Sequence, residues 1–156
     1  MKNSNIISLE NSLKRIENYI PAADSIHLKI SKATVGWQLD HSLKVMNSVV
    51  KVMQDSDPNM YVDNFSFLGK VLLCINFIPR GKAKVPKKLV SPTIILKDDL
   101  YAQLTLAKEN LLAVQKVDKN AYFKHPIFGN VNQERALRFF YVHTHHHLKI
   151  VKQVLK

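Results

Sequence analysis

The chain has 156 residues, a net charge of +11 and a single cysteine, Cys74. This length fits one domain, 1–156, with a substantial buried core, and one cysteine excludes an internal disulfide and fits a reducing cytoplasm. No run of about 18 apolar residues is present, which argues against a membrane span, and the first residues lack the apolar core of a signal peptide. We therefore expect a cytoplasmic protein in which Cys74 is buried as a small apolar side chain.

Glycine is scarce and apolar residues recur at helical spacing, which predicts an all-α fold. We expect a first helix over about Ser8–Tyr19, ended by Pro21, and a second helix over about Lys32–Gln54. A third helix is predicted over Phe65–Ile78. Because this third segment is apolar almost throughout, we place it at the centre of the fold.

A long connection, Arg80–Lys97, follows the third predicted helix, and connections of this length inside a domain are often functional. Within it, the apolar segment Thr93–Leu96 is either a short strand or an apolar strap across the helices. Asp98 or Asp99 is expected to cap a fourth helix that continues to about Asp118.

A turn, Phe123–Gly129, precedes the last predicted helix, which has Asn132 as its expected N-cap and continues to the C-terminus. The pattern as a whole predicts a helical bundle of about four long helices, with a short extra helix at the N-terminus. We find no internal repeat and no sign of a second domain.

Positive charge is densest in Arg80–Lys88, which contains no acidic residue. Such a run can contact phosphates, but it has no interleaved aromatic residues for base stacking. It also lies in a proline-containing connection and not on a recognition helix. The pattern favours a solvated basic loop over a nucleic-acid site, and attraction of an anionic small substrate toward a nearby pocket remains an alternative.

Four of the seven histidines fall within the five-residue run His143–His147 on the last predicted helix. His143 and His147 share the face on which core residues are expected, whereas His145 falls on the solvated face and His146 lies between the two faces. Two imidazoles four residues apart can bind one divalent metal ion. The spacing favours this interpretation over a pair of hydrogen-bonded core histidines.

The best candidate for a third ligand is His41, in the second predicted helix. It lies off the polar arc of that helix, on the side of Trp37, and is therefore expected to face the edge of the core. His27 lies in a loop-like segment, and His125 precedes Pro126, which favours extended backbone at a turn. Histidines in such positions are more often structural or solvent-facing than metal ligands.

Helical bundles build metal sites from inward side chains on facing helices, and His41, His143 and His147 together fit this design. Three neutral imidazoles leave one position open on a tetrahedral ion. Water at that position ionises near neutral pH and a thiol is held as thiolate, so the same site suits a hydrolase or a thiol S-transferase. Zinc is the default metal, and nickel is an alternative. A non-catalytic metal-binding bundle would need a fourth protein ligand, and no obvious one is visible.

The chain also resembles the DinB-like (YfiT-like) metalloenzymes over about Arg15–Val151. The turn His125–Gly129 is similar to the His-Pro-Phe-Phe-Gly turn of one uncharacterised branch of that superfamily. Two further motifs carry the resemblance. One is a tryptophan and a histidine at the start of a long helix, here Trp37 and His41. The other is a His-x-x-His-His pattern on the last helix, here His143, His146 and His147.

The resemblance implies an up-down-down-up four-helix bundle with a long crossover between the third and fourth helices. It implies a divalent metal bound by His41, His143 and His147, with His146 a neighbour and not a ligand. It further implies homodimers, a small-molecule substrate, and low-molecular-weight thiols such as mycothiol or bacillithiol as co-substrates. Arg135 stands where the branch has an acidic residue, and His145 stands where it has a polar or acidic one. These departures weaken any transfer of substrate specificity.

Overall fold

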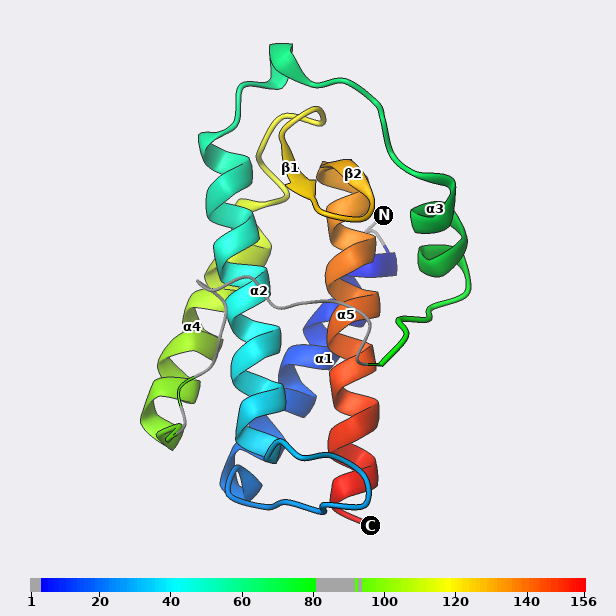
Figure 1. Cartoon of the computed structure of the whole chain (residues 1–156). Coiled ribbons are helices and arrows are strands. Elements are labelled where there is room, and N and C mark those ends of the chain that lie inside the picture. Colours follow the sequence, from blue (N-terminus) through cyan, green and yellow to red (C-terminus); the bar gives the residue numbers. More distant parts are fainter. Residues whose placement is uncertain (1–3, 81–91, 93) are drawn as a thin grey trace.

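Four long helices form the body of the protein, as a computed structural model that describes residues 4–80, 92 and 94–156 shows (Figure 1). Helix α1 packs against both α4 and α5, and α2 packs against the same two helices. The bounds of these four helices are α1 Ser4–Tyr19, α2 Val35–Asp55, α4 Lys97–Ala113 and α5 Gln133–Val154. The fold is thus a helical bundle, although it is not purely helical, because the described residues also form one two-stranded sheet.

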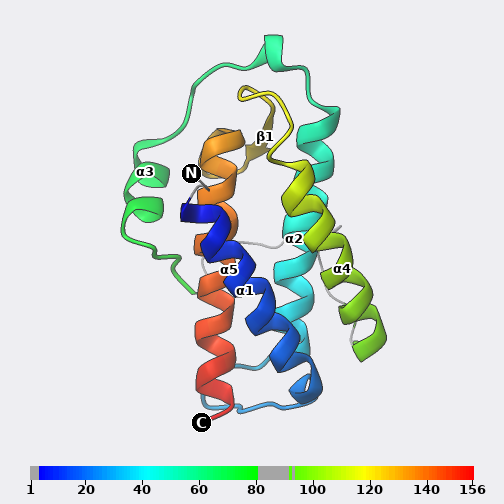
Figure 2. The same ribbon diagram turned by 180° about the vertical axis from the view of Figure 1, so that it is seen from behind.

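Helices α1 and α5 run in one direction along the bundle, and α2 and α4 run in the other (Figures 1 and 2). The chain must therefore travel the length of the bundle between α2 and α4, and on this path lie the one-turn helix η2 (Pro58–Met60) and the short helix α3 (Phe67–Cys74). The expectation that the N-terminal helix is the extra one was wrong. Helix α1 belongs to the bundle, and α3 is the additional element.

Side-chain and backbone features set where the helices begin. Thr34 caps α2 by accepting a hydrogen bond from the backbone N–H of Trp37 at 3.1 Å, and Asn132 caps α5 as predicted. The predicted cap of α4 was wrong. Its N-cap is Leu96, and Asp98 and Asp99 lie in the first turn, where carboxylates interact favourably with the positive end of the helix dipole. Residues 94–96 form no strand.

Helix α3 corrects the prediction of a central third helix. It begins at Phe67, after the cap residue Ser66, and only Gly69 and Leu73 within it are buried. Phe67 is 80% exposed, and Cys74 is exposed as well, so the prediction of a buried cysteine was wrong. Figure 1 shows α3 beside the bundle and not inside it. An apolar sequence on all sides of a helix does not indicate which side is covered.

The sheet is a hairpin of β1 (Tyr122–His125) and β2 (Gly129–Asn132), with His125 opposite Gly129 in the register. The turn between the strands was predicted, but the strands were not. Gly129 adopts a φ of 80°, and a Cβ on it would lie 2.6 Å from the backbone oxygen of Asn64. Both the backbone angle and the close approach of a second segment therefore require glycine here.

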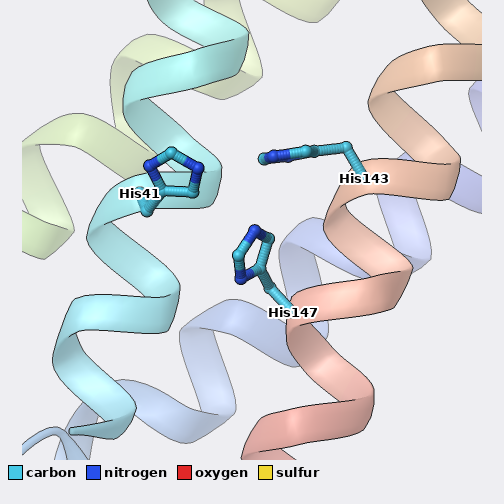
Figure 3. A group of neighbouring side chains, drawn as sticks. All are labelled: His41, His143 and His147. Carbon is cyan, nitrogen blue, oxygen red and sulfur yellow. The ribbon is translucent and has the colours of Figure 1, made fainter. Parts of the chain in front are cut away.

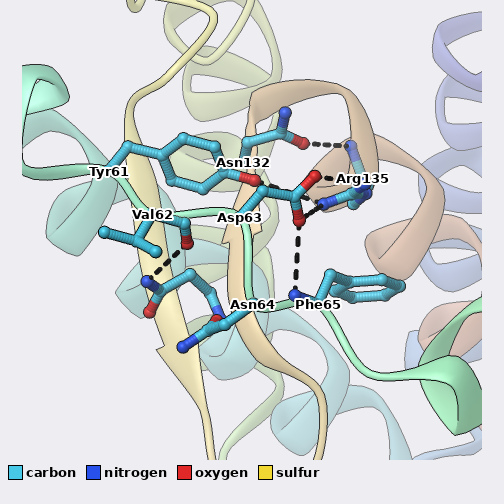
Figure 4. Close-up of polar contacts among 8 residues, drawn as sticks. Tyr61, Val62, Asp63, Asn64, Phe65, Asn132 and Arg135 are labelled. Atoms are coloured by element: carbon cyan, nitrogen blue, oxygen red, sulfur yellow. Dashed lines mark hydrogen bonds and ion pairs between the residues drawn. The ribbon is translucent and has the colours of Figure 1, made fainter.

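The segment that approaches Gly129, residues 61–64, is held by hydrogen bonds to the hairpin and to the start of α5 (Figure 4). Arg135 donates two hydrogen bonds to the carboxylate of Asp63, at 2.6 and 3.0 Å, and a third to the hydroxyl of Tyr61. Asn130 donates its backbone N–H to Asn64 at 2.7 Å. The network joins three parts of the chain and holds the hairpin against the bundle.

Among the described residues, none of the helices combines the length and apolarity that crossing a lipid bilayer requires. The basic cluster Arg80–Lys88 lies outside the described residues except for Arg80. Arg80 is exposed and donates a hydrogen bond to Gln153 at 2.6 Å.

Candidate metal centre

Three histidines converge between α2 and α5 (Figure 3). His41 extends from α2, and His143 and His147 extend from consecutive turns of α5, as the four-residue spacing predicts. One ring nitrogen of each histidine lies within 4.8 Å of the others. The ring centroids are 5.2 Å apart for His41 and His143, 5.0 Å for His41 and His147, and 4.6 Å for His143 and His147. The structure thus brings together the three residues that the sequence analysis selected.

The three rings differ in their access to solvent. His41 and His147 are buried, with exposed fractions of 6% and 7%, whereas His143 is partly exposed. The indole of Trp37, one turn before His41, stacks on the His41 ring at 5.1 Å with an interplanar angle of 12°. A divalent ion among the three nitrogens would therefore be shielded on the α2 side and reachable from the His143 side.

A hydrogen bond to Gln38 determines which nitrogen of His147 is available to a metal ion. Ser31 Oγ lies 3.1 Å from the carbonyl oxygen of Ala33, to which it donates its single proton, and it accepts hydrogen bonds from Ala33 N–H and from Gln38 Nε2. The amide oxygen of Gln38 must then face His147, whose Nδ1 lies 2.6 Å away. Because an amide oxygen only accepts, His147 Nδ1 carries the proton and Nε2 keeps its lone pair.

This contact is the outer support that ligating histidines ordinarily have, since a metal-binding imidazole usually donates its second N–H to a fixed acceptor. Gln38 was not among the residues predicted for the site. A signal was available, because Gln38 lies three residues before His41 on the same side of an amphipathic helix. A glutamine that is 97% buried needs a polar partner nearby.

Electrostatics also favour the neutral imidazoles that metals bind. Burial lowers the pKa of His143 and His147 well below the usual 6.5, and the neighbouring histidines lower both pKa values further. Neutral rings at physiological pH offer lone pairs without first losing a proton.

The other four histidines lie outside this cluster. His146 contacts the His147 ring edge-on at 5.1 Å, and His145 faces Tyr141 at 5.6 Å. His27 is exposed in a loop, as expected. His125 was predicted as a turn residue, but it is the last residue of β1, directly before the turn, and its ring forms part of a cavity wall beside the cluster.

That cavity has a volume of about 660 Å³ and is bounded by all three clustered histidines. Its surface is mainly apolar, with a few polar groups, which is typical of small-molecule sites. The apolar wall includes Val45, Val49, Leu72, Phe139 and Ile150. The open side of the histidine cluster therefore faces a space large enough for a small organic molecule.

Comparison of the chain with family models, with curated proteins and with solved structures found no match. Within the described part of the chain, the cluster contains three potential ligands and no fourth cysteine, carboxylate or histidine. Three imidazoles without a fourth protein ligand form the donor set of an open divalent site.

Proposed function

We propose that the chain is a metal-dependent enzyme that binds one divalent ion through His41, His143 and His147 and binds its substrate in the adjoining cavity. The observation that carries this proposal is the convergence of three imidazoles at the wall of a cavity of about 660 Å³. Zinc suits three imidazole ligands, and nickel is the alternative.

Each part of the proposed site would have a separate role. His41 and His147 would hold the ion from the buried side, and Gln38 would fix the ring of His147. When bound, the ion would supply the Lewis acidity that makes water or a thiol nucleophilic near neutral pH. The apolar cavity wall would exclude bulk water and orient the substrate. A thiol S-transferase and a hydrolase both fit this arrangement.

The resemblance to the DinB-like superfamily is part of the proposal. It is supported by the helical bundle, by the early Trp37 and His41, and by the histidine pattern on α5. If the chain belongs to this superfamily, a low-molecular-weight thiol is the first co-substrate to test, and a homodimer is the expected assembly.

The test is metal content, measured by elemental analysis of untagged protein purified without added metal. We expect about one zinc or nickel ion per chain, lost in both His41→Ala and His147→Ala. His145→Ala is the matched control, because His145 lies in the same run but outside the cluster. Metal retained in His41→Ala or His147→Ala would overturn the ligand assignment.

A second measurement separates an enzyme from a metal-binding structural protein. The cobalt-substituted protein should change its visible spectrum when 2-mercaptoethanol is added, because an open position admits a thiol ligand. A spectrum that does not respond would indicate a closed, non-catalytic site.

A further inference from the structure

His125 closes the β1–β2 turn with one side of its ring. Its Nδ1 lies 3.1 Å from the backbone nitrogen of Ile127 and 3.1 Å from that of Phe128, and it accepts a hydrogen bond from each. A nitrogen that accepts two N–H groups carries no proton of its own, so the proton of the neutral ring is on Nε2. The turn thereby selects one tautomer of His125.

Aromatic contacts fix the orientation of this ring. It stacks on Phe128 at 4.2 Å with an interplanar angle of 14°, and it meets Phe139 edge-on at 5.4 Å. Burial lowers the pKa of His125 to about 4, so the ring stays neutral at physiological pH. The Nε2–H group is at the ring edge directed away from the turn, and the two hydrogen bonds to the turn both involve Nδ1.

The ring lines the same cavity as the histidine cluster. Phe139 lies between them, with its ring 5.4 Å from His125 and 5.5 Å from His143. The intervening wall is apolar, with Val45 and Val49 from α2. A ligand that contacts both the cluster and His125 therefore meets apolar surface along its body and one N–H donor at the far side.

We infer that His125 is a substrate-binding residue whose Nε2–H donates a hydrogen bond to an oxygen atom of a mainly apolar substrate. The substrate class is thus an apolar body with a carbonyl or similar oxygen placed away from the reacting group. The inference rests on the proposed function, because it assigns a substrate contact to the same cavity. It assigns a separate task to His125, which lies outside the three-histidine cluster.

Two substitutions separate the two tasks of the ring. In His125→Asn, the amide oxygen replaces Nδ1 as the acceptor for the turn, and the donor toward the cavity is lost. In His125→Gln, the longer side chain can present an N–H near the former Nε2 position, and the turn contacts are lost. The first variant tests the proposed donor without removing the support of the turn.

The probe is acetophenone, an aromatic ring with one carbonyl oxygen, and ethylbenzene is the matched compound without the oxygen. Binding is measured by NMR titration of metal-free protein. We expect acetophenone to bind His125→Asn about five-fold more weakly than it binds the wild type, the effect of one lost hydrogen bond. Ethylbenzene should bind both proteins equally, and His125→Gln should regain part of the acetophenone affinity.

Equal acetophenone affinity in the wild type and His125→Asn, or no measurable binding to the wild type, would overturn the inference. Nitrogen NMR of the wild type gives an independent check, since His125 Nδ1 must show the shift of an unprotonated ring nitrogen. The opposite tautomer would also overturn it. None of these measurements needs a metal ion, so failure of the elemental analysis would defeat the proposed function and leave this test intact.

Discussion

Gln38 and His147 form a hydrogen bond across the space between α2 and α5, with 2.6 Å between the amide oxygen and Nδ1. The bond links two helices that both contribute to the histidine cluster. It leaves the lone pair of His147 Nε2 available to a metal ion and limits the rotation of the ring. The metal affinity of the proposed site therefore depends on Gln38, a residue that would not contact the ion.

Replacing Gln38 with alanine should weaken metal binding by roughly 10- to 100-fold, because the His147 ring loses its fixed acceptor. Competition with a chromophoric chelator gives the dissociation constant. Gln103→Ala is the control, since Gln103 bonds to Asp40 on another face of α2. Gln38→Glu keeps an acceptor and should retain the metal. Wild-type affinity in Gln38→Ala would show that the hydrogen bond has no part in the site.

The metal-free protein should lose stability as the pH falls below 6.5. The folded pKa values of His143 and His147 lie well below the usual value of 6.5, so in this range the unfolded chain binds protons that the folded chain does not. Unfolding then becomes easier by up to about 1.4 kcal/mol per pH unit for each histidine. Urea midpoints measured between about pH 8 and 5 in the presence of a chelator check this sign.

In the pH experiment, His143→Gln should make the dependence of the urea midpoint on pH less steep, since His147 and His125 still contribute. His27→Ala removes an exposed histidine and should leave this dependence unchanged. A wild-type curve that stays flat from neutral to acidic pH would contradict the burial-driven pKa shifts.

Replacing Gly129 with alanine should destabilise the protein by about 1–3 kcal/mol, the usual cost of a strained backbone. Two causes act together, the positive φ of 80° and a Cβ 2.6 Å from the Asn64 backbone oxygen. Gly129→Asn separates them, because asparagine tolerates positive φ but also has a Cβ. Thermal unfolding should show that asparagine does not restore wild-type stability. Full restoration would mean that the contact with Asn64 is unimportant.

Removing the Arg135 side chain should cost about 1 kcal/mol, because its ion pair with Asp63 is partly exposed. Hydrogen bonding from Arg135 lowers the pKa of Asp63 from the usual 3.8 to about 2. The stabilisation from this ion pair is therefore fully present above pH 3.8 and is lost as the pH falls toward 2. Denaturant titration of Arg135→Ala measures the loss. Arg135→Lys, which cannot form the two-pronged contact, should recover little of it, and metal content should be unchanged in both variants.

The sequence predicted the elements whose apolar residues follow a clear helical period. Leu9, Leu13 and Ile16 of α1 are buried as that period requires, and the cluster residues lie on the expected faces of their helices. These features are predictable because a helix places residues three and four apart on one face whatever its surroundings.

Other features depend on tertiary contacts. The position of α3 could not be derived, because Phe67 and Leu68 are as apolar as the residues of a core helix although they are exposed. The strands of the hairpin contain four residues each, too few to show an alternating pattern. Their position follows from contacts such as that between Asn130 and Asn64, which join segments far apart in the chain.

The compact run His143–His147 keeps four imidazoles within reach of one another even when α5 is unfolded. Unfolded chain would therefore retain some capacity to chelate zinc, and any affinity of the unfolded state subtracts from the stabilisation that a ligand provides. His41, about a hundred residues earlier in the chain, joins the run only in the folded protein. The rise in melting temperature on adding zinc would then reflect mainly the additional affinity that His41 provides by linking α2 to α5. This rise would be smaller than the zinc affinity of the complete folded site suggests.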